Sequence, residues 1–278
     1  MKKIKLISVI LALVLMISCF AACGGKPENP TDASSDASTE ANEATDEVTE
    51  EGTEAVEGAV LTMGTNAAFP PYEFVADDGS FAGIDVEIAS AVAEKLGMTL
   101  EVKDMEFDSL ISAVEGGVVD VVLAGLTVNE ERMEKVNFST SYAKGVQVII
   151  VKEGSEITDV EGLAGKIIGV QAGTTGDIYC TGDYGQENVK QFANGGLAVQ
   201  ALLNDQVDCV VIDNEPAKAF VAANEGLVIL DTEYTNEDYA AAFAKENTEL
   251  LDNFNAALAE LTEAGTISEI IEKYIPAE

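Results

Sequence analysis

The sequence predicts an α/β protein built from two similar lobes. Short apolar runs alternate with helical patterns from residue 59 onward, which predicts a mainly parallel sheet covered on both faces. In addition, the segment 111–125 can be laid on the segment 199–213 at an offset of 88 residues, and both read as helix, turn, Val-Asp and apolar strand. This internal similarity predicts two lobes built alike; a chance match of two such segments is the alternative.

The elements follow in chain order from the periodicity of apolar residues. Apolar residues at every fourth position predict a helix over 84–97, which Gly97 ends. Strands are expected at 60–64, 98–102, 118–123, 146–151, 166–170 and 207–212, and the further helices at 110–114, 175–181, 196–203, 247–263 and 267–274. The chain is expected to cross between the lobes near 141–145 and again near 237–240, and two crossings make a hinge.

The N-terminus carries the pattern of a secretory signal over residues 1–22. Lys2, Lys3 and Lys5 precede the apolar stretch 6–17, and small residues follow. A transmembrane anchor is the alternative, because the uncharged run 6–25 is 20 residues long.

Residues 23–58 have a different composition from the rest of the chain. The segment 26–58 holds eleven acidic residues against one Lys and has no aromatic residue. Such a segment buries too little apolar surface to offset its chain entropy, so we expect a disordered acidic tether. An acidic tail that binds a partner is the alternative.

The charge and composition of residues 59–278 exclude several classes of function. This part has 39 acidic and 11 basic residues, a net charge of −28, so it has no basic stripe for nucleic acid. The chain has no His, which removes His-based metal sites and Ser-His or Cys-His nucleophiles, and we expect no metal or cofactor. Cys180 and Cys209 could pair, but their scattered positions favour ordinary small apolar residues.

Arg132 is the only arginine of the chain and lies one turn into a short helix that Asn129 can cap. A planar guanidinium is a natural bidentate partner for a carboxylate. A surface ion pair with Glu130, Glu131 or Glu134 is the alternative interpretation.

Two further segments offer groups for a charged ligand. Thr174 and Thr175, in the loop Gly-Thr-Thr-Gly, open a helix whose free N–H groups would favour an anion, although a plain turn would also have this sequence. Asp213 ends a strand, where its carboxylate could hold an ammonium group or cap the helix before Pro216.

Aromatic residues could wall a pocket near these groups. Phe69 precedes two consecutive prolines, which favour a rigid extended loop, and Phe107 opens a helix after the strand 98–102. Core packing is the alternative role for these rings.

Together these segments resemble the polar amino-acid family of periplasmic (type II) solute-binding proteins, over essentially all of residues 59–278. The matching runs are Gly64-Thr-Asn66-Ala-Ala-Phe69-Pro-Pro-Tyr-Glu-Phe74, Gly83-Ile-Asp85-Val-Glu87, Ala124-Gly125-Leu-Thr127, Glu131-Arg132, Gly173-Thr174-Thr175-Gly176 and Val211-Ile-Asp213-Asn-Glu-Pro216. The resemblance implies two Rossmann-like lobes joined by a two-strand hinge. Lobe 1 would comprise residues 59–142 and 238–278, and lobe 2 residues 143–237.

The resemblance also implies a role for each site residue. Arg132 would grip the ligand α-carboxylate, helped by N–H groups at Thr127 and around Thr174 and Thr175. Asp213, the Gly125 carbonyl and the Thr127 hydroxyl would hold the α-ammonium. The positions that flank or tune the ligand side chain would be Phe69, Phe107, Asn66, Gln171 and Ile212.

The family further implies where the protein acts and with what. Phe-Ala-Ala-Cys23 resembles a bacterial lipobox, so Cys23 would carry a lipid that anchors the protein outside the cell membrane; Cys19 is a weaker candidate. The ligand would be a free polar L-amino acid, uncharged or cationic, delivered by a monomer to an ABC transporter permease. The alternatives are an enzyme like the cyclohexadienyl dehydratases and a sensory amino-acid-binding protein.

Overall fold

The structure is a computed structural model that describes residues 58–276. The predicted signal sequence, Cys23 and the tether as far as residue 57 lie outside the described residues. None of the helices within 58–276 combines the length and the apolar character needed to cross a membrane.

The first sheet has five strands in the order β5-β1-β6-β14-β7. Its strands are β1 (Val60–Thr65), β5 (Thr99–Asp104), β6 (Val121–Val122), β7 (Val136–Phe138) and β14 (Ala242–Ala244). β1 pairs in parallel with β5 and β6, whereas β14 runs antiparallel to β6 and β7. A small antiparallel sheet of β2 (Ala68–Phe69), β3 (Glu73–Val75) and β4 (Phe81–Ala82) follows β1 in the chain.

The second sheet has the order β10-β9-β11-β8-β12, and β13 also pairs with β8. Its strands are β8 (Ala143–Lys152), β9 (Ile168–Gln171), β10 (Val189–Phe192), β11 (Cys209–Asp213), β12 (Leu227–Ile229) and β13 (Thr235–Tyr239). β9 is parallel to β10 and β11, and β8 is antiparallel to its neighbours.

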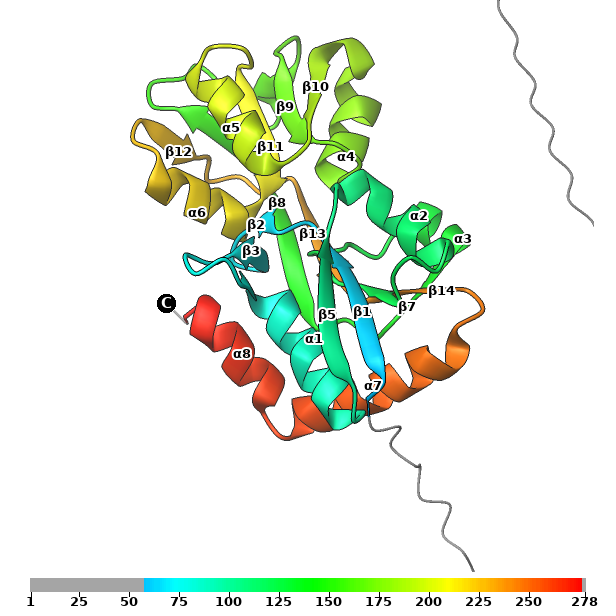
Figure 1. Cartoon of the computed structure of the whole chain (residues 1–278). Coiled ribbons are helices and arrows are strands. Elements are labelled where there is room, and N and C mark those ends of the chain that lie inside the picture. Colours follow the sequence, from blue (N-terminus) through cyan, green and yellow to red (C-terminus); the bar gives the residue numbers. More distant parts are fainter. Residues whose placement is uncertain (1–57, 277–278) are drawn as a thin grey trace, which may run out of the picture. The chain divides into compact units, whose positions relative to one another are not determined.

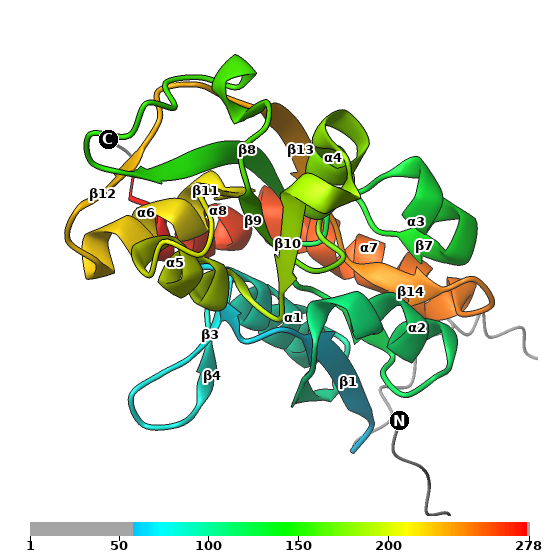
Figure 2. The ribbon, with the colours of Figure 1, turned by 90° about the horizontal axis from the view of Figure 1, so that it is seen from above.

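Helices complete the two lobes. The first lobe has α1 (Ile84–Lys95), α2 (Leu110–Glu115), α3 (Glu130–Lys135), α7 (Thr248–Glu263) and α8 (Thr266–Tyr274). The second has α4 (Thr175–Tyr184), α5 (Gly195–Leu203) and α6 (Asn214–Ala223). α1, α7 and α8 pack together and bury apolar residues such as Ile88, Phe254 and Ile267. Figures 1 and 2 show these helices on the first lobe and α4, α5 and α6 around the second sheet.

The two lobes are joined by the paired strands β8 and β13 (Figure 1). β8 begins directly after Tyr142, and β13 ends at Tyr239, opposite Ala143. The backbone of Thr127 also forms an isolated antiparallel β-bridge with Tyr239. The expected α/β fold of two Rossmann-like lobes with a two-strand hinge is therefore present.

The sheets differ from the expectation in two respects. They are mixed rather than mainly parallel, because the joining strand β8 and the returning strand β14 run against their neighbours. The strand expected at 118–123 shortens to Val121–Val122; next to it, the Asp120 N–H donates to the Thr62 carbonyl (2.9 Å) and the Asp120 carboxylate accepts from the Thr62 N–H (2.8 Å).

Candidate functional site

A cavity lies between elements of the two lobes. The residues that line it are Phe69, Phe107, Ala124, Gly125, Thr127, Arg132, Gln147, Gln171, Thr174, Thr175 and Tyr239. The cavity thus brings together most of the site residues predicted from the sequence, and it omits Asn66, Ile212 and Asp213.

Arg132 is buried in this cavity, with 6 % of its surface exposed. The Asn129 side chain caps α3 by accepting a hydrogen bond from the Arg132 N–H at 2.8 Å, as expected. The guanidinium lies over the Phe107 ring, 5.4 Å from its centroid. Its Nη1 donates to the Thr127 carbonyl (2.7 Å), and its Nη2 donates to the Gly173 carbonyl of the other lobe (3.1 Å).

The alternative interpretation of Arg132 as a surface residue is wrong. Arg132 forms no ion pair with the described acidic residues, and its helix neighbour Glu131 pairs with Lys135 instead. Burial lowers the pKa of the Arg132 guanidinium to about 10, so the group still carries its charge at neutral pH. A guanidinium has five N–H donors, so donors remain for a ligand beside the two carbonyls.

Backbone N–H groups of both lobes are available beside this guanidinium. Thr127 occupies a non-hydrogen-bonded position of its bridge to Tyr239, which leaves its N–H free. Across the cavity, the Thr174 hydroxyl caps α4 by accepting from the Asp177 N–H (3.3 Å). The first N–H groups of α4, at Thr175 and Gly176, have no partner within the helix and suit an anion.

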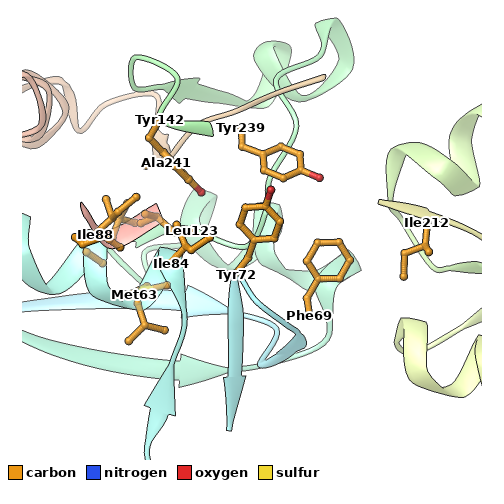
Figure 3. Close-up of a cluster of buried hydrophobic side chains, with 14 of the residues drawn as sticks. Met63, Phe69, Tyr72, Ile84, Ile88, Leu123, Tyr142, Ile212, Tyr239 and Ala241 are labelled. Atoms are coloured by element: carbon orange, nitrogen blue, oxygen red, sulfur yellow. The ribbon is translucent and has the colours of Figure 1, made fainter. Parts of the chain in front are cut away.

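The aromatic wall of the cavity comes from the first lobe and the hinge. Phe69 stacks on Tyr72 with ring centroids 6.1 Å apart, and Tyr72 meets Tyr239 edge-on at 5.2 Å. Figure 3 shows these three rings side by side, with Ile212 of the other lobe on a separate segment. Gly125 has a φ of 52°, and a Cβ there would lie 2.9 Å from the Phe69 ring, so glycine keeps the wall in place.

The position of Gly125 is fixed from behind by a buried acidic residue. Asp85, in the first turn of α1, accepts the Gly125 N–H at 2.7 Å. Burial raises the pKa of the Asp85 carboxyl to about 7, and the hydrogen bond from the Gly125 N–H opposes this shift.

Asn66 and Gln171 form a hydrogen bond across the two lobes. The Gln171 Nε2 donates to the Asn66 Oδ1 at 3.0 Å, and the Asn66 Nδ2 donates to the Met105 carbonyl at 2.8 Å. The Gln171 Oε1 is buried and has no hydrogen-bond partner. Because Gln171 lines the cavity and Asn66 does not, Asn66 can act on a ligand through Gln171.

Asp213 is buried behind the cavity and caps α6, which is one of the two roles that the sequence suggested for it. Its Oδ1 accepts from the Glu215 N–H (3.1 Å), and its Oδ2 accepts from the Val146 N–H (3.0 Å) and the Tyr239 hydroxyl (2.5 Å). Burial raises the pKa of the Asp213 carboxyl to about 7 despite these donors. Its contact with an ammonium group stays a prediction.

Three lining residues were not predicted: Ala124, Gln147 and Tyr239. Gln147 and Tyr239 lie on the joining strands, so only the pairing of β8 with β13 brings them to the cavity. A signal for Gln147 was present, because it is a polar residue within a buried apolar run. Cys180 and Cys209 are both buried and free, in agreement with their interpretation as small apolar residues.

Two α/β lobes, two paired joining strands and a cavity between the lobes define a solute-binding protein of the type II periplasmic class. The chain belongs to the bacterial extracellular solute-binding proteins, family 3, whose family model matches residues 61–277.

Individual relatives within this family are similar over most of the chain. The arginine-binding extracellular protein ArtP of Bacillus subtilis is 35 % identical over 224 residues, which cover 78 % of this chain and 87 % of ArtP. An ancestral arginine-binding protein has been solved with arginine (41 % identity, TM-score 0.74, 78 % of this chain and 98 % of that chain covered). An ancestral arginine-binding protein has also been solved with glutamine (40 % identity, TM-score 0.76, 79 % of this chain and 99 % of that chain covered).

Proposed function

We propose that this protein binds a free amino acid with a hydrogen-bond-donating side chain, arginine above all, and delivers it to an ABC transporter permease. The observation that carries the proposal is the buried guanidinium of Arg132, which has no ion pair among the described residues and lies beside the free N–H groups of Thr127 and α4. A cationic group among free N–H donors is suited to an α-carboxylate. Asp213, the Gly125 carbonyl and the Thr127 hydroxyl would then hold the α-ammonium.

The side-chain end of the ligand follows from the groups that lack partners. The buried Gln171 Oε1 has none, and a buried acceptor without a donor is costly. A guanidinium, an ammonium or an amide could donate to it between the rings of Phe69 and Phe107. Acidic amino acids are disfavoured, because Arg132 is the only basic residue among those described that lines the cavity. The relatives named for arginine, and the one solved with glutamine, agree with this range.

The lining also bears on the alternative of an enzyme. A dehydratase of the cyclohexadienyl type needs a carboxylic acid poised over the ligand, and no Asp or Glu among residues 58–276 lines the cavity. The relatives reported above are named as binding proteins. These names support binding rather than catalysis as the proposed function.

Delivery requires the protein to stay at the membrane and to close on its ligand. We infer that residues 23–58 form the tether, that Cys23 at its start carries the lipid anchor, and that the lobes divide at 142/143 and 237/238. Closure would be stabilised by the bonds that already join the lobes, from Arg132 to Gly173 and from Gln171 to Asn66. A screen of the free L-amino acids by thermal shift tests the proposal: arginine should raise the melting temperature most, and no shift with any of them would overturn it.

Specificity should respond to Asn66. Replacing Asn66 by Asp adds a negative charge next to Gln171, so affinity for arginine should rise relative to glutamine by at least about tenfold, which is the effect of one charge about 12 Å away at an effective dielectric constant near 20. The measurement is the ratio of the two dissociation constants by calorimetry. Asn253→Asp is the matched control, because it adds the same charge at an exposed position of α7, a helix that contributes no residue to the lining of the cavity. If Asn66→Asp leaves the ratio of the two dissociation constants unchanged, Asn66 does not determine specificity.

A further inference from the structure

We propose that Glu237 is a positioning residue of the amino-acid site, which fixes the Thr127 hydroxyl as a hydrogen-bond acceptor for the ligand α-ammonium. The inference rests on the proposed function and deepens it, because it assigns how one end of the ligand is recognised.

Glu237 lies on the joining strand β13 and is 6 % exposed, which is unusual for a carboxylate that has no ion pair among the described residues. It does not line the cavity, but two of its hydrogen-bond donors do. Its Oε2 accepts from the Thr127 hydroxyl at 3.0 Å and from the Gln147 Nε2 at 3.1 Å. Behind the ligand cavity, Glu237 therefore accepts one hydrogen bond from the first lobe and one from β8.

The direction of the bond to Thr127 decides what that hydroxyl can offer a ligand. A carboxylate only accepts hydrogen bonds, so the single proton of the Thr127 hydroxyl points at Glu237. The lone pairs of the hydroxyl oxygen remain for a donor in the cavity. The hydroxyl can then accept from an ammonium group, and it cannot donate to a carboxylate. The backbone N–H of Thr127 serves the opposite end of the ligand.

The charges around Glu237 favour the same assignment. The Glu237 Oε1 is buried without a well-formed hydrogen bond, and the neighbouring Tyr179 phenol has its pKa raised by burial first and by this carboxylate second. Arg132 is the base that faces it, and Asp213 and Tyr239 are the other ionisable neighbours. The Glu237 carboxylate and the partly ionised Asp213 thus accompany one guanidinium, and a ligand ammonium would favour the ionised form of Asp213.

The test compares L-arginine with 5-guanidinopentanoic acid, which lacks only the α-ammonium, in the parent and in Glu237→Gln. In the parent, loss of the ammonium should weaken binding by about 10- to 100-fold, the range for a charge-assisted hydrogen bond. In Glu237→Gln the same change of ligand should weaken binding at least about fivefold less, because a neutral amide no longer fixes the direction of the Thr127 hydroxyl. Thr127→Val, which removes the hydroxyl, should abolish the effect of Glu237→Gln on this ratio.

Asp238→Asn is the matched control. It removes a negative charge from the next residue of β13, where an exposed Asp238 pairs with Lys144 at 2.9 Å, and it should leave the ratio unchanged. If Glu237→Gln weakens both ligands equally, Glu237 is only structural and the inference is wrong. If Glu237→Gln does not fold, Thr127→Val provides the test. The inference is then wrong if the ratio of the affinities for L-arginine and 5-guanidinopentanoic acid is the same in Thr127→Val as in the parent. If the parent binds no arginine at all, it is the proposed function that fails.

Discussion

Arg132→Ala should weaken arginine binding by about 2–5 kcal/mol, the loss expected when one partner of a buried charge pair is removed. The ligand α-carboxylate would lose its cation, while the Thr127 and Gly173 carbonyls would lose the donors that hold them. Arg132→Lys should fall between the parent and Arg132→Ala, because it keeps the charge and loses the planar fork. Calorimetry with arginine measures all three proteins.

Lys135→Ala is the control for Arg132. It removes one positive charge from the same helix, but Lys135 is exposed and pairs only with Glu131 at 3.2 Å, so its effect should stay below about 1 kcal/mol. Thermal unfolding without ligand separates binding from folding. Arginine binding by Arg132→Ala within a few-fold of the parent would place the carboxylate site elsewhere.

Gly83→Ala should destabilise the fold by about 3 kcal/mol or more, because strain and overpacking add. Gly83 has a φ of 121° and a ψ of 173°, a conformation that is essentially restricted to glycine. A Cβ there would lie 2.2 Å from the Tyr72 carbonyl oxygen. That carbonyl cannot move away freely, because it accepts the Asp85 N–H at 2.9 Å.

Gly79→Ala isolates the steric part of this prediction. Gly79 also has a positive φ, of 85°, but nothing lies within 4 Å of an added Cβ. Gly79→Ala should therefore lower the free energy of unfolding only by the cost of a positive φ for a residue with a side chain, about 1–2 kcal/mol. Urea unfolding of both variants gives the comparison, and equal losses would show that the contact with Tyr72 is not rigid.

Much of the fold could be predicted from local patterns. The stripe of Ile84, Ile88 and Val92 marks α1, and the Asn129 cap marks α3, because both depend on spacing along a single segment. The antiparallel strands β8 and β14 could not be oriented in this way. Their direction depends on partners far away in the sequence, which periodicity does not report.

The same distinction applies to the candidate site. Arg132, Phe107 and Thr127 lie in segments with recognisable motifs, and the cavity contains all three. Tyr239 and Gln147 reach it through the pairing of two joining strands, and Glu237 acts through a hydrogen bond to Thr127. Asp213 had two interpretations on its sequence, and only the tertiary structure shows the cap together with the bond from Tyr239.

The most direct test of the central claim is calorimetry of the unmodified protein with L-arginine and with agmatine, which is arginine without its α-carboxylate. If Arg132 and the free N–H groups grip that carboxylate, arginine should bind at micromolar concentration or below, and agmatine should bind at least about 30-fold more weakly. Equal affinity for the two compounds, or no binding of arginine, would contradict the account.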